Sequence, residues 1–86
     1  MTEDARATRT ARLLVARLEA LARVAGQLRH AEAERLVELA SVATMRAVAL
    51  ELIRVEQARE IWRDAHVRHP ELPQPARLEL PQRLAA

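Results

Sequence analysis

Residues 31–68 read AEAERLVELASVATMRAVALELIRVEQAREIWRDAHVR and contain neither glycine nor proline. The stretch therefore lacks the two residue types that are least favourable inside a helix. Apolar residues recur in it at spacings of three and four, which is the period of an amphipathic α-helix. We predict one long helix over this range. It ends before Pro70, because a proline disfavours helical backbone in the residue that precedes it.

A first helix is predicted upstream, over residues 4–28. Its apolar residues alternate in spacing between four and three, which makes one continuous stripe on a helix. The stripe consists of Leu14, Leu18, Leu21, Ala25 and Leu28, and it is widened by Leu13 and Val24. Glu19 and Arg23 are four residues apart, so they are spaced for an ion pair on this helix.

The connection between the helices, from Gly26 to Glu32, admits two interpretations. The only glycine of the chain can end a helix as a left-handed C-terminal residue, yet no Ser, Thr, Asp or Asn follows to cap a second helix. One unbroken helix is the alternative. The stripe favours a break, because its continuation lands on Glu32 and Arg35 whereas a new apolar stripe starts at Leu36. We therefore predict an antiparallel helical hairpin.

The longer helix carries apolar residues on two sides. One seam consists of Leu36, Leu39, Ala43, Ala47, Leu50, Ile53 or Arg54, Gln57 and Ile61. The other consists of Val37, Thr44, Val48, Val55 and Trp62. A helix that is apolar on two sides needs more than one neighbour. The first helix, about 37 Å long, covers the second only to about residue 55.

An uncovered stripe of this size exceeds what monomers usually expose, and a second copy can cover it in an isologous contact. We therefore expect an obligate all-α homodimer, in which residues 1–69 of two hairpins form a four-helix bundle with coiled-coil packing. The residues expected in the oligomer interface are Ala43, Ala47, Val48, Leu50, Val55, Ile61 and Trp62.

Residues 70–86 hold all four prolines, so an extended C-terminal arm is expected there. The arm contains a repeat, in which Glu71-Leu72-Pro73-Gln74 recurs as Glu79-Leu80-Pro81-Gln82. Two leucine–proline pairs are candidate anchors for docking on a partner protein: Leu72 with Pro73, and Leu80 with Pro81. The alternative is that the arm packs along its own bundle or is disordered.

No pattern in the sequence points to catalysis. There is no cysteine for thiolate chemistry, and the Ser and Thr residues lack a histidine at helical spacing that could act as a base. His66 and His69 are three residues apart, but the Glu-x-x-His pair of ion-binding bundles is missing. We interpret both as solvated residues at a helix C-terminus. We expect no catalytic residues, no cofactor and no metal.

The charge and the residue types of the chain bear on whether it binds nucleic acid or a membrane. The formal net charge is +2, every basic residue is arginine, and Trp62 is the only aromatic residue. Arginine suits phosphate binding, but acids are interleaved and aromatics for base stacking are missing, so nucleic-acid binding is the alternative function. No apolar run reaches the roughly 20 residues that span a bilayer.

An alanine-rich chain without lysine is typical of a GC-rich genome. We expect a cytoplasmic bacterial protein that acts as a scaffold, adaptor or regulator, with itself and another protein as partners and no membrane contact.

Overall fold

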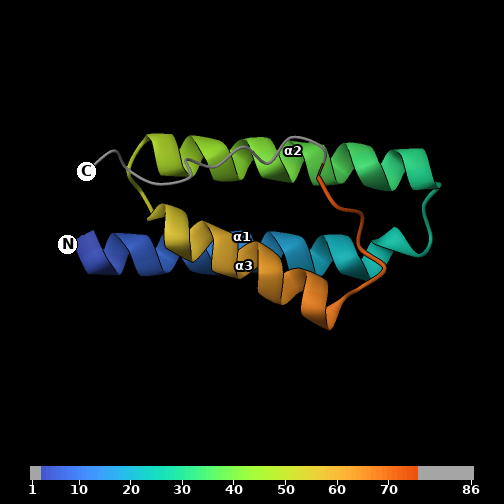
Figure 1. Cartoon of the computed structure of the whole chain (residues 1–86), viewed down its shortest axis with the longest axis horizontal. Coiled ribbons are helices and arrows are strands. Elements are labelled where there is room, and N and C mark those ends of the chain that lie inside the picture. Colours follow the sequence, from blue (N-terminus) through green and yellow to red (C-terminus); the bar gives the residue numbers. More distant parts are fainter. Residues whose placement is uncertain (1–2, 76–86) are drawn as a thin grey trace.

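The computed structural model describes residues 3–75, with side chains from residue 5 onward. This part contains three α-helices: α1 (Glu3–Ala25), α2 (His30–Ala49) and α3 (Val55–Arg68). It contains no strand, so the predicted all-α class is confirmed. α1 and α2 run antiparallel, and α3 lies obliquely across α1 (Figure 1).

The first connection confirms the predicted break near Gly26. α1 ends at Ala25, and the Gln27 N–H donates to the Val24 carbonyl at 2.9 Å in a tight turn. Gly26 does not have a positive φ, so the expectation of a left-handed residue at this helix end is wrong.

The second connection contradicts the helix predicted over residues 31–68. α2 ends at Ala49 and α3 begins at Val55, so the described chain is a three-helix arrangement and not a two-helix hairpin. The polypeptide reverses between them, which lays α3 back along α1 (Figure 1). The residues at the end of the predicted long helix form α3 instead, and they pack against α1 of the same chain.

A Schellman motif ends α2. The Leu52 N–H donates to the Ala47 carbonyl and the Glu51 N–H to the Val48 carbonyl, both at 2.9 Å. Glu51 has a φ of 59°, the left-handed conformation that glycine usually supplies in this motif. Because a glutamate occupies the position, the sequence gives no glycine signal for the break.

α2 and α3 begin with the same local hydrogen bond. The Arg29 N–H donates to Glu32 Oε1, and the Arg54 N–H donates to Gln57 Oε1, each at 3.1 Å. This is one half of a capping box, in which the third helical residue reaches back to the residue before the helix. The usual signal of a helix start, a side-chain oxygen on the residue before the helix, is missing at positions 29 and 54, because arginine has no side-chain oxygen.

The core lies between the three helices. The predicted stripe of α1 is buried at Leu14, Leu18 and Leu21, but Leu13 is 65% and Val24 41% exposed, so neither widens it. From its predicted seams, α2 buries Val37 and Thr44 of the second and Ala47 of the first. Its buried residues are Ala33, Val37, Ala40, Ser41, Thr44 and Ala47.

Trp62 joins α3 to α2 within this core. It is 3% exposed, and its indole N–H donates to the Thr44 hydroxyl at 2.9 Å. The prediction of Trp62 at an interface between copies rested on a helix end that α1 could not reach. The reversal after α2 removes that reason, because it brings Trp62 into the core of its own chain.

Residues 69–75 follow α3 and fold back onto the bundle; we call this segment the strap. Leu72 is 2% exposed and belongs to the same buried cluster as Leu18, Val37 and Trp62. The first leucine of the repeat therefore docks on its own bundle, with Pro73 half-buried beside it. Leu80 and Pro81 of the second repeat lie outside the described residues.

Candidate functional site

The outer side of α2 is a continuous apolar surface, which we call the α2 stripe. Its large side chains run from Leu36 to Leu50, the residue that follows the helix, and remain accessible: Leu36 is 38%, Leu39 52%, Val42 49% and Leu50 63% exposed. Ala43 and Arg46 complete the stripe, the first half-buried and the second exposed. These residues include much of the first predicted seam, which therefore faces away from the core.

The middle of the α2 stripe is slightly hollowed. Leu39, Ala43, Arg46 and Leu50 are among the residues that line an open depression of about 350 Å³. The small side chain of Ala43 leaves room for another helix to approach. The aliphatic part of Arg46 can lie along apolar surface while its guanidinium group stays in water.

The structure separates the seven residues predicted at an oligomer interface. Ala47, Val55 and Trp62 are buried within the chain. Val48 and Ile61 are half-buried and pack against the core. Ala43 and Leu50 remain, and both belong to the α2 stripe.

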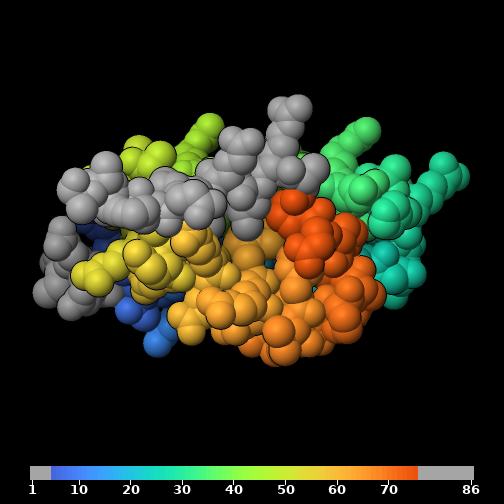
Figure 2. Space-filling view, in the orientation of Figure 1, coloured from blue at the N-terminus to red at the C-terminus, as the bar shows by residue number. Residues whose placement is uncertain are grey.

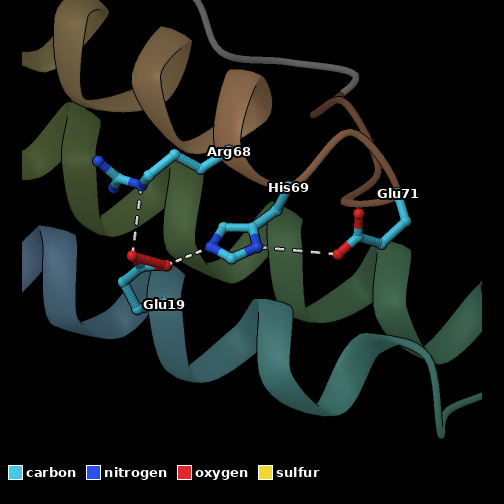
Figure 3. A network of polar contacts seen from close by, with 4 residues as sticks. All are labelled: Glu19, Arg68, His69 and Glu71. Carbon is cyan, nitrogen blue, oxygen red and sulfur yellow. Dashed lines mark hydrogen bonds and ion pairs between the residues drawn. The ribbon is translucent and has the colours of Figure 1, made fainter.

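A polar network ties the strap to α1 (Figure 3). His69 contacts the Glu19 carboxylate through Nε2, and its Nδ1 lies 3.8 Å from the Glu71 carboxylate. Arg68 Nε lies 3.4 Å from the other carboxylate oxygen of Glu19. Glu19 thus faces the end of α3 rather than its predicted partner Arg23.

His66 contacts the strap from α3. Its Nδ1 lies 3.0 Å from the Trp62 carbonyl oxygen, and its Nε2 lies 3.1 Å from the Pro73 carbonyl oxygen. The imidazole also stacks on the Trp62 ring, with 6.0 Å between the centroids. The interpretation of His66 and His69 as solvated residues is therefore wrong.

Sequence inspection misses this network for a physical reason. The acceptors of His66 are backbone carbonyls, which every residue has, and Glu19 is 50 positions away from His69. The spacing of the prolines was the available signal. A helix that must end before Pro70, with Pro73 shortly after it, indicates that the chain changes direction there.

Within residues 3–75, no group of three or more His, Cys, Asp or Glu side chains is placed to hold a metal ion. No known protein family, curated protein or solved structure matches the chain. None of the helices described is both long and apolar enough to cross a membrane. The α2 stripe and the histidine network are the candidate functional features of residues 3–75.

Proposed function

We propose that the protein is a small helical interaction module, without catalytic activity, that pairs with a second copy of itself through the α2 stripe. One observation carries this proposal. α2 is apolar on two sides, and the bundle buries one of them while the large side chains of the other stay 38% to 63% exposed. A contiguous apolar surface on a protein in water commonly marks a contact site.

An antiparallel second copy fits the stripe in shape. Leu36 and Leu50 are equally far along the chain from Ala43, on either side of it. If two α2 helices cross at Ala43 in opposite directions, Leu36 comes opposite Leu50 of the partner subunit. The distance between packed helices depends on the side chains at the crossing, so alanine there permits a close approach.

The charges at the ends of the stripe fit the same arrangement. Arg35 and Glu51 are exposed and are also equally far from Ala43. Arg35 lies within α2, whereas Glu51 lies in the turn just beyond it, so the antiparallel crossing brings Arg35 toward the turn that carries Glu51 of the partner subunit, and the two-fold symmetry repeats this approach. A parallel crossing would set like charges beside one another. Charge pairs at the rim of an interface mainly select its orientation.

The dimer should be weaker than the obligate one expected from the sequence. The chain has a core of its own, which includes Trp62, so we expect it to fold without a partner. The 20 residues of α2 extend about 30 Å. One face of such a helix is smaller than the roughly 800 Å² that each partner buries in a standard interface. We expect a monomer–dimer equilibrium.

The substitution Leu39→Glu tests this proposal. Leu39 is 52% exposed near the centre of the stripe, so a charge there should abolish self-association and, at concentrations where the parent is monomeric, leave helix content and melting unchanged. The matched control is Val67→Glu on α3, at a side chain 74% exposed outside the stripe, which should associate like the parent. Sedimentation equilibrium over a concentration series measures both. Undiminished association of the Leu39 variant would reject the stripe as the contact face.

Arginine-dependent nucleic-acid binding is a second candidate, favoured by one observation. Arg6, Arg9 and Arg12 are all exposed along the first half of α1. Binding to random duplex DNA that weakens steeply from low to moderate salt would support this function. Failure to bind duplex at low salt would remove it.

A further inference from the structure

The outer side of α1 carries a field of positive charge. Five arginines of this helix are exposed: Arg6, Arg9, Arg12, Arg17 and Arg23. Among the side chains of α1 from residue 5 onward, Glu19 is the only acid, and it faces the end of α3 instead. None of the five arginines forms an ion pair with a carboxylate of residues 5–75. Their charge therefore reaches the solvent over about 26 Å, the helical rise from residue 6 to residue 23.

An apolar stripe runs between these arginines. Leu13, Ala16, Ala20 and Val24 follow one another at spacings of three and four, which places them on one side of the helix. Leu13 is 65% and Val24 41% exposed, so the bundle leaves both side chains largely in water. Figure 2 shows the first half of α1, in blue, emerging from beneath α3. We call this stripe, together with the five arginines, the α1 face.

The arginines lie on both sides of the apolar stripe. At about 100° per residue, Arg17 falls on one side of it, and Arg12 and Arg23 fall on the other. Leu13 also lines an open depression of about 510 Å³ with Arg9 and Arg12 among its neighbours. An apolar centre between charged flanks is the pattern by which one helix pairs with another. The alanines in the centre permit a close approach.

The charges of the α1 face decide which helix fits it. A second copy that offered its own α1 would bring arginines against arginines, and like charges across an interface are costly. The phosphates of duplex DNA would pair with the arginines, but they offer no apolar surface to cover Leu13 and Val24. An acidic amphipathic helix matches both parts, because its apolar side covers the stripe and its carboxylates pair with the guanidinium groups.

We propose that the α1 face binds an acidic amphipathic helix of another protein. The apolar side of that helix covers Leu13 and Val24, and its carboxylates pair with Arg12, Arg17 and Arg23. These ion pairs lie at the rim, so they set the orientation and the association rate and weaken as salt rises. The α1 face does not include the α2 stripe, so this binding does not depend on pairing between two copies.

A synthetic helical peptide is the probe for this surface. It has about 18 residues, which extend about 27 Å in a helix, with leucines in one stripe and glutamates on both sides. Fluorescence anisotropy of the labelled peptide with the full chain at low salt should show binding that weakens as salt is added. A second peptide, with lysine in place of every glutamate, should not bind. Equal binding of the two peptides would overturn the proposal.

Substitution of the flanking arginines tests the charge complementarity. The triple variant Arg12→Gln, Arg17→Gln and Arg23→Gln should bind the acidic peptide about tenfold more weakly, since each exposed ion pair contributes little alone. The control variant removes the same charge from exposed arginines outside α1: Arg29→Gln, Arg54→Gln and Arg63→Gln. It should bind the peptide like the parent. An equal loss of affinity in both variants would show that only net charge matters and would reject the α1 face.

Two further variants separate a helix from other occupants. Leu13→Gln should weaken peptide binding, and unchanged affinity would contradict contact with the apolar stripe. Leu39→Glu, on the α2 stripe, should bind the peptide like the parent even where it abolishes self-association. Loss of peptide binding in Leu39→Glu would place the peptide on α2 and overturn the proposal. Duplex DNA that binds more tightly than the peptide, with an affinity insensitive to Leu13→Gln, would assign the α1 face to nucleic acid instead.

Discussion

The Thr44 hydroxyl joins two helices through a single oxygen atom. It accepts the indole N–H of Trp62 at 2.9 Å and donates to the Ala40 carbonyl at 2.9 Å. Thr44 is 1% exposed, so water cannot replace either bond. A residue that the sequence pattern counts only as one position of an apolar seam therefore fixes how Trp62 sits in the core.

We expect Thr44→Val to lower the free energy of unfolding by about 1–3 kcal/mol, because valine keeps the shape but leaves the buried indole N–H without an acceptor. Ser41→Ala is the matched control. Ser41 is equally buried, but its hydroxyl donates only to the Glu38 carbonyl of its own helix, so its loss should be smaller. Urea unfolding measures both. Equal decreases in the free energy of unfolding would show that the hydrogen bond to Trp62 contributes no more to stability than the hydrogen bond of Ser41.

At the level of elements, the turn after α2 decides the architecture. Periodicity was sufficient to predict the helical class, the buried stripe of α1 and the break near Gly26. It failed between α2 and α3, where neither glycine nor proline occurs. One signal was nevertheless present. The first predicted seam of residues 31–68 contains the polar residues Arg54 and Gln57 before it reaches Ile61. A similar interruption of an apolar stripe, by Glu32 and Arg35, indicated the break near Gly26.

Glu51 holds this turn in a conformation that costs a residue with a Cβ atom about 1–2 kcal/mol. We expect Glu51→Gly to raise the free energy of unfolding by up to about 1 kcal/mol, since glycine adopts a positive φ freely. The control Glu56→Gly, in the first turn of α3, should instead lower it by about 1 kcal/mol. Denaturant unfolding at low protein concentration compares the two. Destabilisation by both substitutions would contradict this account of the turn.

The whole molecule buries one side of α2 and leaves the other in water. From the sequence we predicted that the helix over residues 31–68 needs more than one neighbour, and we placed Ala43 and Leu50 on the surface that we propose for pairing. We assigned Val55 and Trp62 to the same surface because we treated residues 31–68 as one straight helix. A reversal of the chain changes which residues remain uncovered, and helical periodicity does not contain that information.

The site at the strap could not be predicted from the sequence for a related reason. His69 meets Glu19 only because α3 lies along α1, and His66 meets the Pro73 carbonyl only because the chain folds back after Pro70. Both contacts follow from tertiary structure. By contrast, the α2 stripe lies within a single helix, so its spacing could be recognised before its exposure was known.

The most direct test of the central claim is a dilution series followed by two-dimensional NMR of the backbone amides. The α2 stripe should carry the concentration-dependent shift changes, centred on Leu39 and Ala43, while α3 and the strap stay constant. Spectra that do not change with concentration up to about 1 mM, where contacts worth about 4 kcal/mol are half-formed, would contradict self-association. Shift changes located on α3 instead would contradict the assignment of the α2 stripe as the contact surface.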